Sequence, residues 1–326
     1  MKERIGYLDA AKALAILLVI LGHCPMDELG MCGKYLHRLI YSFHMPLFFI
    51  ISGMFFRAAE TRAIVGEKFR AYCLPYLIVG GIVSVVEFFK MGDGWRIFYG
   101  TQGLPARLAS LPSISGCGPL WFLLGLCWGM VALNVIVTHC RKECSMVVIL
   151  IVATLGALSA RLVRMPFSIQ AGCLAVPYLY IGYQMREHES IEWLCKSKSL
   201  IGCLFICWMS SIALDGTFEF GSLLLGGPIA FLFTFVAPII VLCGCKMCRV
   251  KGGWIGRSTL AIFCAHVLVD DCVFRNFGNP FVRWTANPFA NLAIVFSGEL
   301  LCALCLAVVL QKFPVFSAIV GGGRKK

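Results

Sequence analysis

The chain has 326 residues, of which 59% are hydrophobic and only 14% are charged. Soluble globular domains carry about 25% charged residues, so this composition excludes an ordinary soluble protein and indicates an integral membrane protein. The formal net charge is +12, but with no arginine-rich tail and no zinc-finger spacing we interpret the excess as membrane topology and expect no nucleic-acid partner.

The first hydrophobic segment, residues 8–24, holds three ionisable groups inside a membrane-length run: Asp9, Lys12 and His23. Such groups cost about 2.5–3.5 kcal/mol each near the bilayer centre, and they mark candidate functional sites. A helix turns about 100° per residue, which brings Lys12 within about 20° of His23 and places them roughly 16 Å apart along the axis. Asp9 lies on the same face and can pair with Lys12. The alternative is that Asp9 and Lys12 are snorkelling interfacial groups and that His23 only caps the helix.

The second segment, residues 37–56, places His44 close to Pro46 inside an apolar run. A proline frees a backbone carbonyl and can kink a helix. Ser52 and Gly53 permit close helix packing, so no serine nucleophile is expected here. The alternative is a packing helix with one interfacial histidine.

Membrane-length apolar runs recur along the chain, and about 20 apolar residues suffice to span a bilayer. We therefore predict an all-α integral membrane protein with about ten transmembrane helices. The predicted spans are 8–24, 37–56, 72–89, 119–138, 146–163, 169–186, 199–214, 221–243, 254–272 and 290–310. The seventh is the shortest and weakest.

Positive charge is distributed unevenly between the connections of these spans. With a cytoplasmic amino terminus, the inner segments carry eighteen Lys and Arg residues and the outer segments carry nine. Because cytoplasmic segments are enriched in Lys and Arg, we expect both termini to be cytoplasmic. On this topology Asp9 and Lys12 lie toward the cytoplasm and His23 lies toward the opposite face.

The eighteen cysteines lie mostly within apolar runs, where free cysteine packs as a small hydrophobic residue. Cys243, Cys245 and Cys248 have a spacing that could bind a metal, but no second ligand cluster accompanies them. We therefore expect no metal site.

Several stretches, in chain order, resemble the membrane acyltransferase-3 family. The most specific combination is Asp9, Lys12 and His23 in the first segment, followed by residues 42–56. Weaker matches follow at residues 67–76, 118–123, 260–266 and 311–314. The resemblance covers nearly the whole chain and is closest to stand-alone membrane domains that O-acetylate sugars.

The resemblance implies roles for the matched residues. His23 matches the family's first-helix histidine, regarded as the catalytic group, and Asp9 and Lys12 would orient or charge-balance the site. Many members carry two arginines four apart after the second helix. This chain lacks that pair, and Lys68 and Arg70 are the nearest equivalents for contacting the phosphates of CoA. Three further residues are expected to line the acceptor or pantetheine path: His44, Trp121 and His266.

These assignments compete with simpler ones. The basic cluster at Lys68 and Arg70 also fits a topology signal, and Trp121 fits an aromatic core. The chemistry itself suits the residues, because transfer from a thioester to a hydroxyl needs a base and a donor for the oxyanion. Histidine titrates near neutral pH, so His23 is the expected base.

We therefore expect one polytopic domain over residues 1–326, in contact with membrane lipid. The implied activity moves an acetyl or similar short acyl group from cytoplasmic acyl-CoA, acetyl-CoA first, to a hydroxyl of an extracytoplasmic or lipid-linked sugar. The implied location is the bacterial cytoplasmic (inner) membrane. Two other classes stay open: a transporter or flippase for a lipid-linked glycan, since intramembrane charges also mark transport paths, and a structural assembly subunit.

Overall fold

The structure is a computed structural model that describes residues 5–91, 118–162, 165–188, 190–214, 218–219, 224–225, 227–270, 272 and 285–313. These residues are mostly helical, and Phe218–Glu219 (β1) and Leu224–Leu225 (β2) form a short antiparallel pair. The helices are α1 (Gly6–His23), α2 (Met31–Tyr41), α3 (His44–Met54), α4 (Thr61–Lys68), α5 (Leu74–Met91), α8 (Trp121–His139), α9 (Lys142–Leu162), α10 (Ile169–Glu187), α11 (Ser190–Lys196), α12 (Lys198–Leu214), α13 (Pro228–Met247), α14 (Gly253–Arg257), α15 (Thr259–Val269) and α16 (Pro288–Lys312). Short turns η1 (Asp27–Leu29), η2 (Phe69–Cys73), η4 (Gly118–Leu120) and η5 (Pro166–Ser168) join some of them.

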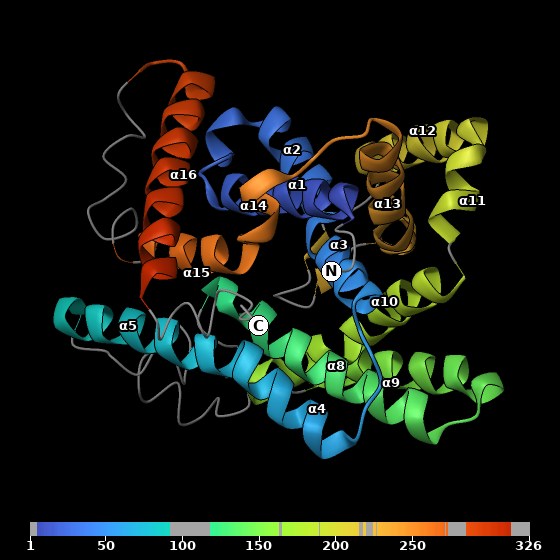
Figure 1. Ribbon diagram of the computed structural model, residues 1–326. Helices are drawn as coiled ribbons and strands as arrows, with labels where there is room; N and C mark the ends of the chain where they lie inside the picture. The colour runs from blue at the N-terminus through green and yellow to red at the C-terminus, as the bar shows by residue number, and fades with distance from the viewer. Residues whose placement is uncertain are drawn as a thin grey trace.

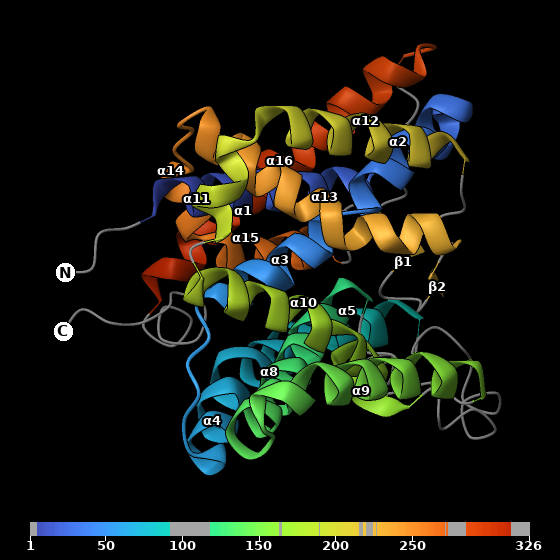
Figure 2. The same ribbon diagram turned by 90° about the vertical axis from the view of Figure 1, so that its right-hand side faces the viewer.

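The long helices form one bundle with α3 and α10 near its centre. Figure 1 and Figure 2 show α4, α5, α8 and α9 on one side of this centre, and α1, α12, α13 and α16 on the other. Helix α10 packs against α8, α3 and α9, and α1 packs against α3, α13, α14 and α15. The first helix, which carries the predicted site, is therefore surrounded by other helices.

Six helical segments in the described parts of the chain are long and apolar enough to cross a membrane. They are Gly6–His23, Thr61–Val86, Gly118–His139, Lys142–Ala160, Ile229–Met247 and Pro288–Lys312. Each overlaps one of the ten predicted spans, so the all-helical membrane architecture is confirmed. Of the other four predicted spans, residues 169–186 form a single helix, α10, which is not one of these six segments. Residues 199–214 correspond to α12, a shorter apolar helix.

Two predicted spans are each divided between two helices, so the prediction of one continuous helix over each of them is wrong. The segment 37–56 is interrupted at Ser42 and Phe43, between α2 and α3. Pro46 lies in the first turn of α3, where its missing N–H leaves no helical hydrogen bond unmade. The segment 254–272 is interrupted at Ser258, between α14 and α15; residue 271 lies outside the described residues.

The segment 221–243 begins later than predicted. Leu224 and Leu225 are in β2, and α13 starts only at Pro228. Proline is favoured at the first position of a helix because its fixed backbone angle suits that position and its missing N–H is not needed. Residues 221–223 and 226, like residue 163 at the end of the fifth predicted span, lie outside the described residues.

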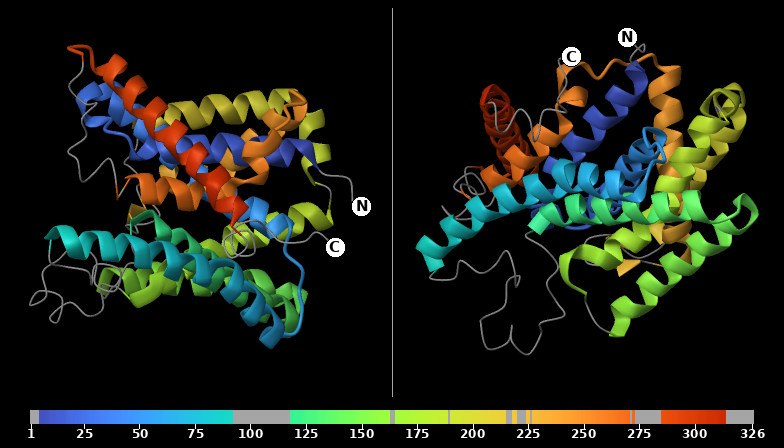
Figure 3. Two further views of the ribbon diagram at one scale, coloured as in Figure 1. Left: turned by 60° about the vertical axis from the view of Figure 1, so that its left-hand side comes forward. Right: turned by 60° about the horizontal axis from the view of Figure 1, so that its bottom comes forward.

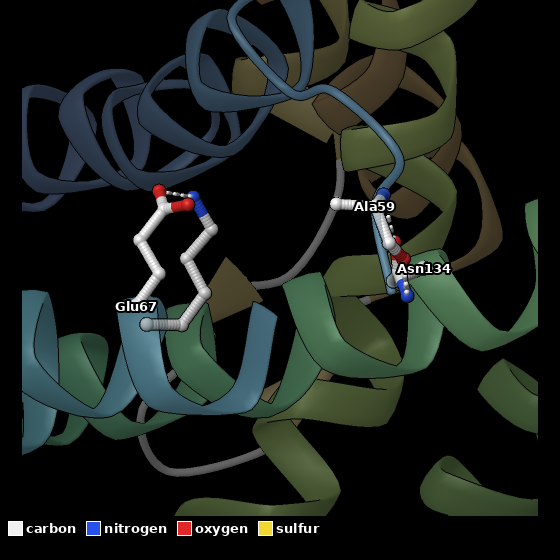
Figure 4. Close-up of polar contacts among 4 residues, drawn as sticks. Ala59, Glu67 and Asn134 are labelled. Atoms are coloured by element: carbon white, nitrogen blue, oxygen red, sulfur yellow. Dashed lines mark hydrogen bonds and ion pairs between the residues drawn. The ribbon is translucent and has the colours of Figure 1, made fainter. Parts of the chain in front are cut away.

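Backbone contacts and one buried amide fix how these helices meet. Gly53 of α3 faces Leu179 of α10, and Gly182 of α10 faces Ile50 of α3, so the two helices meet backbone to backbone. Asn134, fully buried in α8, accepts a hydrogen bond from the backbone N–H of Ala59 and donates one to the carbonyl of Ala59. Figure 4 shows this pairing of the chain before α4 with α8.

The connecting elements gather at two ends of the bundle. Figure 2 shows α4, α11 and α14 at one end, and α2 with β1 and β2 at the other. Helix α1 begins at the first end and finishes at the second. The left view of Figure 3 shows α16 crossing α1 and α15 obliquely. Several charges used to predict the topology lie outside the described residues: Lys2, Arg4, Arg96, Arg107, Arg164, Arg275, Arg283, Arg324, Lys325 and Lys326.

Candidate active site

Asp9 and Lys12 form the predicted ion pair in the first half of α1. Lys12 Nζ lies 2.7 Å from Asp9 Oδ1, and both side chains are about one-fifth exposed. Helix α14 covers this turn so closely that a Cβ on Gly256 would lie 1.9 Å from the carbonyl oxygen of Asp9. The pair is therefore held within the protein rather than extended to the solvent.

A cavity of about 190 Å³ opens beside Lys12. Its walls come from α1, α3, η2, α8 and α15, and aromatic rings form much of them. Phe122 contacts Phe48, Phe49 and Phe263, with ring centroids 5.1–5.7 Å apart. The lining residues are Lys12, Ile16, Met45, Phe48, Ile51, Ser52, Tyr72, Phe122, Leu123, Leu126, Thr259, Leu260 and Phe263.

Helices α1 and α15 run side by side in the same direction. Lys12 and Thr259 share the cavity wall, and further along the two helices the rings of His23 and His266 lie 5.2 Å apart, inclined by 37°. His266 lies three residues beyond the cavity-lining Phe263 on α15. The cavity thus lies beside Lys12, and the two histidines lie further along α1 and α15, outside its lining.

Glu299 of α16 lies behind this histidine pair. Its Oε1 is 2.6 Å from Nδ1 of His266, and the two side chains are 2% and 0% exposed. Cys24, directly after His23, donates its S–H to Oε2 of Glu299 over 3.4 Å. His23 itself is half-buried, so it is the more accessible of the two histidines.

The predicted basic residues lie beside the cavity. Lys68 ends α4 and pairs with Glu67 at 2.6 Å (Figure 4), with its side chain 13% exposed. Arg70 is exposed on the π-helical turn η2, and Tyr72 of the same turn lines the cavity. One short segment thus joins the mostly buried Lys68 and the exposed Arg70 to the cavity wall.

Of the predicted site residues only Lys12 lines the cavity, and two of the others, His44 and Trp121, also lie outside the histidine cluster. His44 is buried at the start of α3, where Nδ1 contacts the carbonyl of Ile40 at 2.7 Å and the ring packs edge-on against Tyr41. Tyr41 in turn donates to the carbonyl of Gly22, the residue before His23. Trp121 is half-buried next to Phe122, with their ring centroids 6.1 Å apart.

Sequence reasoning missed four residues of this region. Ser52, assigned only to packing, and Tyr72 line the cavity, while Glu299 and Cys24 contact the histidine region. An acidic residue inside the apolar run 290–310 was a signal for Glu299, because such residues mark function in membrane helices. No comparable signal exists for Ser52 or Cys24, whose residue types are common in apolar helices.

Metal-ligating side chains are dispersed. Within the parts of the chain that the structure describes, no three His, Cys, Asp or Glu side chains are grouped so that they could hold a metal ion. The residues around His23 are instead arranged as an acid–base row of glutamate and two histidines.

Comparisons with known proteins cover almost the whole chain. The model of the acyltransferase domain family matches residues 5–310. Nodulation protein NolL of Sinorhizobium fredii is 24% identical over 307 residues, which cover 82% of this chain and 77% of NolL. No solved structure matches.

Proposed function

Since this chain belongs to the acyltransferase-3 family and is an integral membrane acyltransferase, we propose that it moves an acetyl group from acetyl-CoA to a hydroxyl of an extracytoplasmic or lipid-linked sugar. One observation carries this proposal. Lys12 lines the apolar cavity near the end of the bundle that holds α4 and α14, and His23 lies on the same helix, α1, toward the end that holds α2. A donor and an acceptor could thus meet from opposite faces of the membrane.

The residues support a direct transfer. The half-buried ring of His23 takes the proton of the sugar hydroxyl as that oxygen attacks the thioester carbonyl. The C–S bond then breaks, and His23 returns the proton to the departing thiolate, so the histidine ends the cycle unchanged. Lys12, paired with Asp9, offers positive charge at the wall of the cavity.

The cavity wall favours an uncharged acyl group. Lys12 is the only charged residue among the described residues that line it, and it already pairs with Asp9. A succinyl group would bury a second carboxylate without a partner of its own, which is costly in an apolar site. We therefore propose acetyl as the preferred group, and a bacterial cytoplasmic membrane with both termini inside as the setting.

The direct test uses the purified protein in nanodiscs with radiolabelled acetyl-CoA, succinyl-CoA or octanoyl-CoA and a lipid-linked glycan extract. The expected result is alkali-labile label on the glycan, highest with acetyl-CoA and absent without acceptor. Preference for succinyl-CoA would contradict the cavity argument. A protein that transfers no acyl group from any of the three would contradict the proposed reaction, and glycan movement across proteoliposomes would then support the transporter alternative.

The segment of Lys68 and Arg70 is proposed to hold the phosphates of CoA. Exposed charge pairs contribute about 0.2–1 kcal/mol, so Lys68→Gln or Arg70→Gln is expected to raise KM for acetyl-CoA about two- to fivefold with kcat unchanged. Added NaCl should reduce the difference in KM between these variants and the wild type, because salt screens exposed charges.

The matched control is Arg141→Gln, which removes an exposed charge from the connection between α8 and α9. Its KM is expected to equal that of the wild type. If all three variants change KM equally, the effect belongs to the overall charge of this face and not to a CoA site.

A further inference from the structure

Glu299 is a carboxylate deep in a membrane-length apolar helix. It is 2% exposed, and it is the single Asp or Glu in α16. Burying an isolated carboxylate costs several kcal/mol, which only close partners repay. In membrane helices such groups face the protein interior and mark functional sites. The proposed reaction by itself gives Glu299 no role.

Both oxygens of this carboxylate are engaged around His23. Oε1 lies 2.6 Å from Nδ1 of His266, whose ring neighbours that of His23. Oε2 accepts the S–H of Cys24, which follows His23 in the chain. Glu299 therefore contacts both the ring beside His23 and the side chain of Cys24, the residue after it.

Exposure separates the roles within this cluster. His266 is fully buried and Glu299 nearly so, whereas His23 is half-buried. A substrate can reach His23 but not the two groups behind it. Glu299 can thus influence the reaction only through other residues.

We propose that Glu299 is a positioning residue: through His266 and Cys24 it fixes the ring of His23 against the sugar hydroxyl. This inference rests on the proposed function. A carboxylate close to one ring nitrogen holds the orientation of a histidine; Glu299 does this for His266, whose ring lies beside that of His23. In serine hydrolases a carboxylate also stabilises the imidazolium that forms when histidine takes a proton, and the charge of Glu299 acts on His23 in the same sense through His266.

A second acid faces the same cluster. Asp270, 6% exposed at the end of α15, interacts electrostatically with Cys24. It stays in place when Glu299 is changed, so a Glu299 variant removes the contacts of one carboxyl group and leaves the other. The expected effect is therefore mainly that the ring of His23 loses its fixed orientation.

The decisive variant is Glu299→Gln, which keeps the size of the side chain and removes its charge. We expect kcat to fall about 10- to 100-fold, the range for residues that orient a functional histidine, with KM for acetyl-CoA within about twofold of the wild type. Glu299→Asp retains the charge on a shorter stem, and its kcat should lie between those of the wild type and Glu299→Gln. A purely structural role would lower the yield or the melting temperature without this ordering.

The matched control is Glu192→Gln in α11. Glu192 is exposed, and the hydrogen bond and charge of Lys246 lower its pKa below the ordinary value, so it is an ionised, paired carboxylate outside the cluster. Its kcat and KM should not change. Melting temperature in detergent and monodisperse elution confirm that each variant folds; if Glu299→Gln does not, His266→Gln takes its place with the same expected fall in kcat.

The outcomes separate the two proposals. A folded Glu299→Gln enzyme with wild-type kcat, or one with raised KM and unchanged kcat, overturns the positioning role while the acyl transfer stands. A wild-type protein that transfers no acyl group from any acyl-CoA overturns both.

Discussion

Replacement of His23 by asparagine is expected to lower acetyl transfer about 100- to 10,000-fold, the usual contribution of a general base. Asparagine keeps hydrogen-bonding capacity at this half-buried position but cannot take a proton at neutral pH. KM for acetyl-CoA should stay near the wild-type value, because His23 is not among the residues that line the cavity. Initial rates with labelled acetyl-CoA and glycan measure both quantities.

The matched control is His139→Asn at the end of α8. His139 is exposed, and its ring contacts Thr138 and the carbonyl of Val135 in its own helix. Its rate should be unchanged. Unaltered transfer by a folded His23→Asn protein would remove His23 from the mechanism, and equal loss of folding and activity would favour the assembly-subunit alternative.

Substitution of Gly182 by alanine is expected to lower the stability of the fold substantially. A Cβ at this position would lie 1.9 Å from the carbonyl oxygen of Ile50, an atom of the backbone of α3 that no side-chain rotation can move. Gly53 makes the reciprocal contact with Leu179, so α3 and α10 would have to separate. Overpacking costs about 1–3 kcal/mol or more, against a total stability of about 5–15 kcal/mol.

Thermal unfolding followed by size-exclusion fluorescence measures this effect. Gly202→Ala in α12 is the control, since a Cβ there meets nothing within 4 Å. It should leave the melting temperature unchanged or raise it, because alanine favours a helix by about 1 kcal/mol over glycine. A Gly182→Ala protein that melts like Gly202→Ala would show that the helices adjust freely at this crossing.

Features set by local spacing could be predicted from the sequence. The pairing of Asp9 with Lys12 follows from a three-residue separation on a helix, and the structure confirms it. The all-helical membrane architecture follows from apolar run length, and six segments bear it out. Membrane orientation and the role of His23 stay predictions that the experiments above address.

Features set by long-range contact could not be predicted. Nothing in the spacing of His266 and Glu299 reveals that α15 and α16 meet behind the end of α1. The break at Ser258 could not be predicted either, because residues 254–272 are apolar enough to be interpreted as one continuous helix. That break lets α14 cover Asp9 while α15 continues alongside α1, so it is a condition for the site.

The contact between Cys24 and Glu299 joins residues 275 positions apart. The ribosome therefore makes one partner of this contact well before the other. At about 5–20 residues per second, the ribosome needs roughly 15–55 s to make the chain between them. During that interval α1 must wait in the translocation machinery or the lipid without α15 and α16. The Asp9–Lys12 pair needs no other helix, so the newborn segment can offset its own charges until its distant partners are made.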